Sequence, residues 1–254
     1  VDSNGQTPLF YATTLGDHEA CAYLIQARCQ PDHVDKLNQS PLFYAASKNH
    51  YSCLALLLNK RCCVNLVDKN RQTALFYAFK SKSCACAAAL LEAVCDPNRR
   101  DNSGQTALFF AATAGSVDQV NLLIENLAIV DQEDRSGWTP LFMAAQGGHR
   151  SVCKVLVETH LVDPKPLDRM GRTALKVAED AKHVAVATLI KGFMARQQGE
   201  AMTSVAVGLP QQVSKVSQPM PSTNSEALYR AVVEGTPAET RRLLALRADP
   251  HRMA

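Results

Sequence analysis

One short segment recurs along this chain at almost constant intervals. It begins with Thr or Ser, followed by Pro or Ala, Leu, and an aromatic residue in all copies but the last. Intervals this regular indicate one structural unit repeated along the chain, with each unit packed on its neighbours. Copies start 33 residues apart at Thr7, Ser40, Thr73, Thr106 and Thr139, and a last copy starts 34 residues later at Thr173.

Each unit opens with residues that favour a turn and then a helix. An Asp stands five residues before every Thr or Ser, and Gly or Asn stands two residues before it in all units but the third, which has Arg71. Asp with Gly or Asn at this spacing is typical of tight turns. The Thr or Ser suits a helix N-cap, and Pro8, Pro41 and Pro140 suit the first helical position. The pattern therefore predicts a turn followed by a helix.

The rest of each unit predicts a second helix. An Ala stands five residues after the Thr or Ser in all six units, where a small side chain lets helices approach closely. An apolar, leucine-rich helical pattern follows after a short loop. Lys82 and Lys182 predict less ideal ends for the first helix in two units. The other four units have residues that take the left-handed conformation of a helix end: Gly16, Asn49, Gly115 and Gly148.

The unit Asp-x-x-Gly-x-Thr-Pro-Leu-x-x-Ala-Ala resembles the ankyrin repeat. The resemblance covers residues 1–192, about six repeats with the first truncated at its start. It implies an all-α repeat solenoid of stacked helix-turn-helix units with short β-hairpin fingers. The histidine that usually follows the Leu in this family, and links the hairpins by hydrogen bonds, is replaced, so we expect more apolar contact between repeats there. The replacements are Phe10, Phe43, Phe76, Phe109, Phe142 and Lys176.

The pattern changes after the sixth unit. Glu179, Asp180 and Lys182 make that unit more charged, which suits a terminal repeat that needs a polar outer face. Residues 193–225 are rich in Pro, Ser and Gln, and we expect a flexible linker there. Residues 226–254 recover the repeat register, so we expect the start of a further ankyrin-like repeat, truncated at Ala254.

Composition restricts the class of function. The formal net charge is only +3, so we expect no nucleic-acid partner, and no apolar run reaches the roughly 18 residues of a membrane span, so we expect no direct membrane insertion. Seven of the nine cysteines recur at equivalent repeat positions, as Cys29, Cys62 and Cys95 do. This indicates buried free thiols in an intracellular protein, cytoplasmic or nuclear, and their spacing lacks the paired ligands of a zinc site.

The sequence also lacks the motifs of common active sites. It contains no Gly-rich phosphate loop, no Gly-x-Ser-x-Gly and no His-Glu-x-x-His. No set of residues predicts a nucleophile, a base and an oxyanion hole together. We therefore expect no catalytic residues, no cofactor, no metal and no enzymatic activity.

The resemblance implies that partners bind the concave face made by the finger tips and the exposed side of the first helices. Trp138 is either a binding hot spot or a packing contact between fingers, and both interpretations stay open. The residues that the repeat register places on this face are Lys36, Leu37, Gln39, Lys48, Lys69, Asn70, Gln72, Lys80, Asn102, Ser103, Gln105, Arg135, Ser136, Trp138 and Gln146.

The charge of the second and third units suggests the chemistry of the partner. Eight basic residues and two acidic ones lie between Asp35 and Lys82. We therefore expect another protein or peptide with an acidic patch; the alternative is a basic surface that only meets solvent. The sequence predicts a monomeric, non-catalytic protein–protein interaction scaffold. The alternative is a regulatory ankyrin segment of a larger multidomain enzyme or channel.

Overall fold

The computed structural model describes residues 1–159 and 162–206 of the chain, and helices account for all the regular secondary structure of these residues. The first helices of the six repeats are α1 (Pro8–Leu15), α3 (Pro41–Ser47), α5 (Ala74–Lys80), α7 (Ala107–Ala114), α9 (Pro140–Gln146) and α11 (Ala174–Asp180). The second helices are α2 (His18–Gln26), α4 (Tyr51–Asn59), α6 (Cys84–Glu92), α8 (Val117–Glu125), α10 (Arg150–Lys154) and α12 (Val184–Ala206). A π-helical turn, Val155–Thr159, continues α10.

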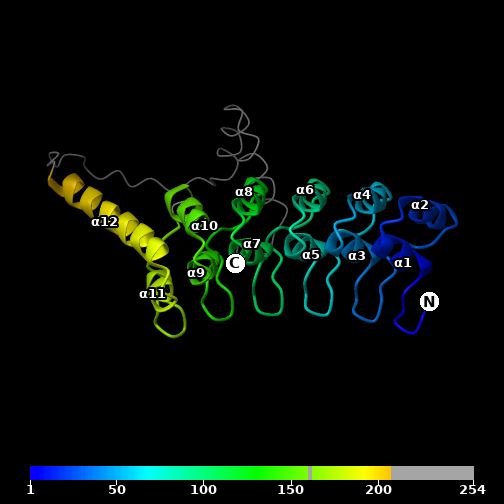
Figure 1. The fold of residues 1–254 in the computed structure, drawn as a ribbon, viewed down its shortest axis with the longest axis horizontal. Helices are drawn as coiled ribbons and strands as arrows, with labels where there is room; N and C mark the ends of the chain where they lie inside the picture. The colour runs from blue at the N-terminus through cyan, green and yellow to red at the C-terminus, as the bar shows by residue number, and fades with distance from the viewer. Residues whose placement is uncertain (160–161, 207–254) are drawn as a thin grey trace, which may run out of the picture. The chain divides into compact units, whose positions relative to one another are not determined.

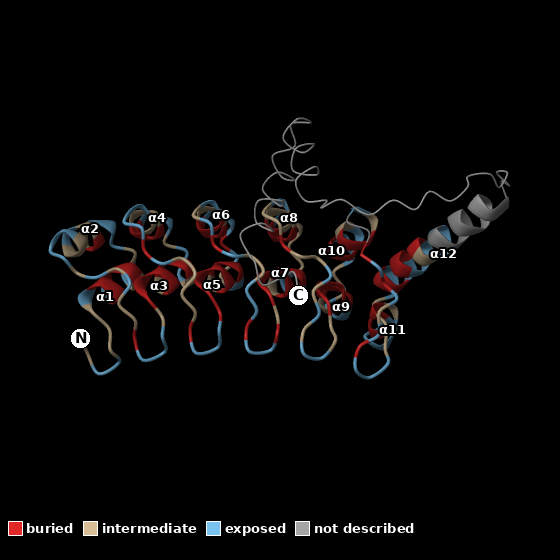
Figure 2. Ribbon diagram, turned by 180° about the vertical axis from the view of Figure 1, so that it is seen from behind, coloured by how far each residue is buried: buried red, intermediate tan, exposed pale blue. Residues whose placement is uncertain are grey.

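Within residues 1–195 the helix pairs stack side by side in two rows. The first helices lie next to the fingers, and the second helices lie on the side away from them (Figure 1). Side chains are buried where the two rows meet, and the finger tips are exposed (Figure 2). The Leu of each repeated segment is fully or almost fully buried in the first five repeats, from Leu9 to Leu141. The predicted all-α repeat solenoid is thus confirmed.

The fingers are hydrogen-bonded turns, and the described residues contain no β-strand. In the second finger, the Asp35 N–H donates to the Gln39 carbonyl at 2.9 Å, and the Asn38 N–H donates to the Asp35 carbonyl at 2.9 Å. A single backbone-to-backbone hydrogen bond joins neighbouring tips, as from the Lys69 N–H to the Leu37 carbonyl at 3.1 Å. The structure therefore does not confirm the β-hairpins that the resemblance implies, because the bonds across the two arms of a finger are too few to form a ladder.

Aromatic contacts join the first helices of neighbouring repeats, as the replacement of histidine by phenylalanine predicts. The Phe10 ring meets Tyr44 edge-on with ring centroids 5.4 Å apart, and Phe43 meets Tyr77 in the same way at 5.6 Å. Phe76 and Phe110 repeat the contact at 5.4 Å. The five phenylalanines at this position are almost completely buried, so apolar contact holds the stack together here.

Histidine has a different structural role in this chain. The His50 Nε2 lies 3.1 Å from the Thr14 carbonyl near the end of the preceding first helix, and His149 contacts the Thr113 carbonyl in the same way at 2.8 Å. Helix ends leave carbonyl groups without partners inside the helix, and the histidine rings serve as their partners. Each ring lies against a glycine: a Cβ on Gly16 would come within 2.6 Å of His50 Nδ1, and one on Gly115 would collide with His149.

This contact explains which residues end the first helices. The left-handed residue after the first helix is a glycine when the next repeat has a histidine against it, as with Gly148 and His183. Where the next repeat has serine instead, the position is Asn49 or Lys82, both with a left-handed φ near 60°. The Ser83 hydroxyl then donates to the Asn49 side chain. The sequence-based expectation considered only the backbone conformation, and the structure adds the space that the histidine ring occupies.

The last helix, α12, extends to Ala206, past the expected end of the array at residue 192 and into the range of the expected linker, 193–225. The rest of that linker and the expected further repeat, 226–254, lie outside the described residues. The sixth repeat has surface ion pairs between Lys176 and Asp180 at 3.0 Å and between Lys191 and Glu179 at 2.6 Å. Its outer surface is therefore polar, as suits a terminal repeat.

The glycine–histidine contact predicts a rescue. Gly115→Asn should lower the free energy of unfolding by about 1–3 kcal/mol, because the new side chain meets the His149 ring. Adding His149→Ser should recover at least part of this loss, because the pair then matches Asn49 and Ser83. Urea unfolding of the wild type, both single variants and the double variant measures the coupling. Strictly additive effects would show that the contact does not decide the choice of residue.

Candidate functional site

One carboxylate fixes the turn of every finger. In the second finger, Asp35 Oδ1 accepts hydrogen bonds from the backbone N–H groups of Leu37 at 2.8 Å and Gln39 at 3.0 Å. Asp68 holds the third finger in the same way, at 2.8 Å from both Asn70 and Gln72. The repeat Asp thus satisfies two backbone donors that the tight turn leaves unpaired.

The second oxygen of the same carboxylate binds the preceding repeat. Gln72 Nε2 donates to Asp101 Oδ2 at 2.9 Å, and Gln105 Nε2 donates to Asp134 Oδ2 at 2.9 Å. Gln39 makes the same bond to Asp68 at 3.4 Å. We call these residues and their bonds the finger network. It consists of the Asp of each finger, the residue that precedes the Thr or Ser of the preceding finger, and the tyrosines whose hydroxyls bind both.

Two tyrosines, Tyr44 and Tyr77, complete the finger network. The Tyr44 hydroxyl donates to Asp35 Oδ2 at 2.7 Å and accepts a hydrogen bond from Gln6 Nε2 at 2.8 Å. Burial alone would raise the pKa of Asp35, but the bonds from Tyr44, from the backbone and from Gln6 outweigh it, so the pKa falls below its ordinary value. Burial and the bond to Asp35 raise the pKa of Tyr44. The pair is therefore an ionised carboxylate held by a neutral hydroxyl.

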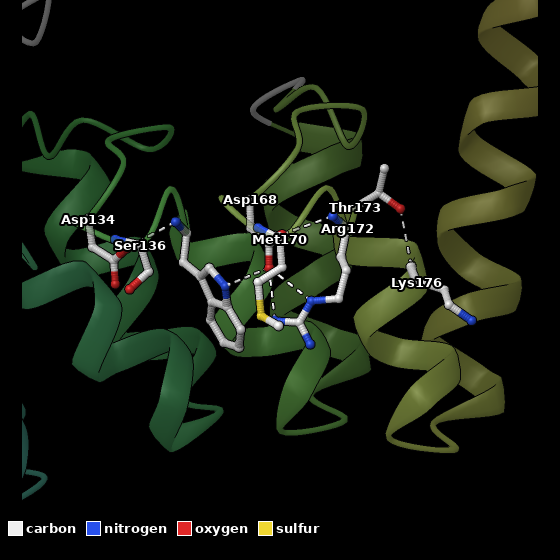
Figure 3. A network of polar contacts seen from close by, with 8 residues as sticks. Asp134, Ser136, Asp168, Met170, Arg172, Thr173 and Lys176 are labelled. Carbon is white, nitrogen blue, oxygen red and sulfur yellow. Dashed lines mark hydrogen bonds and ion pairs between the residues drawn. The ribbon is translucent and has the colours of Figure 1, made fainter.

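The last link of the network uses different residues. Trp138 Nε1 donates to Asp168 Oδ2 at 3.1 Å, so the indole stands in for the glutamine amide. Arg172 takes the position that holds glutamine in the first four repeats, but it contacts its own finger: its Nη2 lies 2.9 Å from Asp168 Oδ2 (Figure 3). The Trp138 ring also stacks on Phe142 at 5.7 Å and lies 5.8 Å from the Arg172 guanidinium. This geometry supports the packing interpretation of Trp138.

The structure divides the predicted binding residues into two groups. Four belong to the finger network and have partners within the array: Gln39, Gln72, Gln105 and Trp138. The remaining eleven have exposed side chains: Lys36, Leu37, Lys69, Asn70, Asn102, Ser103, Arg135 and Ser136 at the finger tips, and Lys48, Lys80 and Gln146 at the ends of first helices. The fingers and first helices that carry this group follow one another along the array (Figure 1).

A comparison with family sequence profiles identifies the repeats. The profile described as ankyrin repeats (three copies) matches residues 9–101, 61–134, 89–165 and 108–198, which together cover more than half of the chain. The chain belongs to the ankyrin repeat family. A comparison with curated proteins gave no match.

Family membership establishes the general class of function. Ankyrin repeats are generally protein–protein interaction modules, and the family is generally non-catalytic. The described helices include none that is both long enough and apolar enough to cross a bilayer. Among the same residues, His, Cys, Asp and Glu side chains form no cluster of three or more that could hold a metal ion.

Part of this ankyrin array's exposed face was not among the predicted binding residues. Arg71 and Arg169 are exposed at the tips of the third and sixth fingers and add to the positive charge of the finger tips. On the first helices, Tyr44, Tyr77 and Phe110 are half-buried at the position after the repeat phenylalanine, with Met143 next in register. For the residues on the first helices, the sequence contained a usable signal: an aromatic residue often follows the repeat phenylalanine directly.

The cysteines of the array are mostly, but not all, buried. Six lie in the core, and burial raises the pKa of the Cys21, Cys62, Cys95 and Cys153 thiols to about 12, so these thiols stay protonated. Cys29 is half-buried. The prediction of buried thiols is wrong for Cys63 and Cys84, which are exposed because one lies in the loop after α4 and the other begins α6.

The lowered pKa of Asp35 predicts acid sensitivity. Its stabilising effect should be fully present above the pKa of an unfolded Asp, about 3.9, and should be lost as the pH falls through the lower value of the folded state. Urea unfolding between pH 7 and pH 2 should show stability falling below about pH 4. Asp35→Asn should be less stable at pH 7 and should lose less over the same range. An equal loss in both proteins would show that Asp35 does not contribute to the pH dependence.

Proposed function

We propose that this chain is a non-catalytic scaffold that binds another protein or peptide on the concave face made by the finger tips and the first helices. The observation that carries the proposal is the charge of the tips. The tip of each finger consists of the three residues that follow its Asp. These residues include no Asp or Glu in any of the six repeats. Five of them are exposed cations: Lys36, Lys69, Arg71, Arg135 and Arg169.

The finger network explains why this positive charge is available to a partner. The carboxylates next to the tips in the sequence are the repeat Asp residues, which accept hydrogen bonds from their own turn and, from Asp35 onward, from the preceding repeat. They cannot rotate to the tip without losing these bonds. None of the ion pairs found in the described part of the chain involves one of these five cations at the finger tips. An acidic partner therefore suits this face best.

The other expectations about partners stay predictions: a monomer, no nucleic-acid partner and an intracellular location. The alternative function, a regulatory ankyrin segment of a larger enzyme or channel, would use the same face.

Charge reversal at the tips tests the proposal. We expect Lys36→Glu, Lys69→Glu and Arg135→Glu together to weaken binding of a captured partner at least about tenfold, with unchanged far-ultraviolet circular dichroism. The matched control is Arg28→Glu, Lys60→Glu and Arg61→Glu, three exposed cations in the loops after α2 and α4, which change the net charge equally. Affinity capture with mass spectrometry identifies the partner, and calorimetry measures its affinity. Equal losses in both variants would place binding elsewhere.

Trp138→Gln separates packing from binding at the fifth finger. Glutamine occupies the equivalent position in the first four repeats and can keep the bond to Asp168. The variant loses the stacking on Phe142, so we expect an unfolding free energy lower by about 1 kcal/mol. We expect the affinity for the partner to change by less than about threefold. A large loss of affinity at unchanged stability would restore the hot-spot interpretation.

A further inference from the structure

Lys80 has an unusually defined position for an exposed lysine. Its Nζ donates to Gln72 Oε1 at 2.6 Å. The same ammonium lies 4.9 Å from the centroid of the Tyr77 ring and 5.0 Å from that of Phe110. Two aromatic faces and one amide oxygen therefore hold a positive charge at a fixed place on the exposed side of α5.

The stack itself does not explain this lysine. At the same repeat position the other repeats have Thr14, Ser47, Thr113, Gln146 and Asp180. Ser47 and Thr113 donate to carbonyls of their own helices and reach no neighbouring finger. The bond between Gln105 and Asp134 forms in the repeat that has Thr113 in place of this lysine. The link between Gln72 and Asp101 therefore does not require Lys80.

The charge of Lys80 is not neutralised within the described part of the chain. None of the ion pairs found there involves Lys80, and an ammonium has three donors, of which Gln72 uses one. Phe110, whose ring lies against this ammonium, is half-buried, and Met143 is half-buried at the equivalent position one repeat further along, so both offer apolar surface. An unpaired fixed cation next to apolar side chains is suited to a carboxylate flanked by an apolar residue.

Building on the proposed function, we propose that Lys80 determines the specificity of this face. It binds the carboxylate of an Asp or Glu side chain in an extended, acidic segment of the partner, and an apolar side chain of that segment packs on Phe110 and Met143. The tip cations attract the same segment, and Lys80 fixes its register along the first helices.

Peptide selection on the full chain tests this proposal. The probe is a displayed library of random twelve-residue peptides, selected on the wild type and counter-selected on the triple tip reversal. We expect the selected peptides to share one Asp or Glu beside an apolar residue. Lys80→Met keeps an unbranched apolar stem and should weaken their binding about tenfold, measured by fluorescence anisotropy, whereas Lys60→Met on the loop after α4 should not.

A double-mutant cycle identifies the contact. Replacing the shared Asp or Glu of the peptide by Asn or Gln should weaken binding to the wild type by the same factor and should not weaken binding to Lys80→Met further. Thermal unfolding shows whether Lys80→Met is folded. If this variant does not fold, Lys80→Gln takes its place in the cycle, because glutamine keeps a donor for Gln72 without the charge.

The outcomes separate this proposal from the proposed function. Peptides that lose binding on tip reversal but not on Lys80→Met, or that share no acidic residue, would overturn the role of Lys80 and leave the binding face in place. A selection in which no peptide depends on the tip cations would overturn both.

Discussion

The structure depends on a carboxylate shared between neighbouring repeats. One oxygen of each finger's Asp fixes its own turn, and from the second repeat onward the other oxygen binds the repeat before it, as Asp101 does with Gln72. A tight turn leaves backbone donors unpaired, and the carboxylate of the repeat Asp accepts their hydrogen bonds. The order of one finger is thereby coupled to that of its neighbour, in addition to the apolar contacts between helices.

This coupling explains how the array presents its exposed face. The acidic residues of the fingers are held at the base of the turns, so the tips show cations and small polar side chains, together with the exposed apolar Leu37 and Met170. Buried phenylalanines and leucines fix the first helices in register, and the residues beside them recur at regular positions along the stack. Such a face suits an extended partner that contacts several repeats at once.

Much of this arrangement could be predicted from the sequence. The period and the turn, cap and apolar positions predicted the helix pairs, and register alone identified the exposed lysines at 36 and 69. It could not show that Gln72 or Trp138 is bonded within the array, because each meets an Asp 29 or 30 residues away only after stacking. The glycine at 115 shows the same limit: its conformation was predictable, but its contact with His149 was not.

Hydrogen–deuterium exchange on a Gln72→Leu variant tests most directly whether neighbouring fingers hold one another in order. Leucine fits this buried position but removes the amide that binds Asp101. The N–H groups of Ser103 and Gln105, which donate to Asp101 in the next finger, should then exchange faster than in the wild type. Unchanged exchange at these two groups would show that each finger is ordered by itself, contrary to this account.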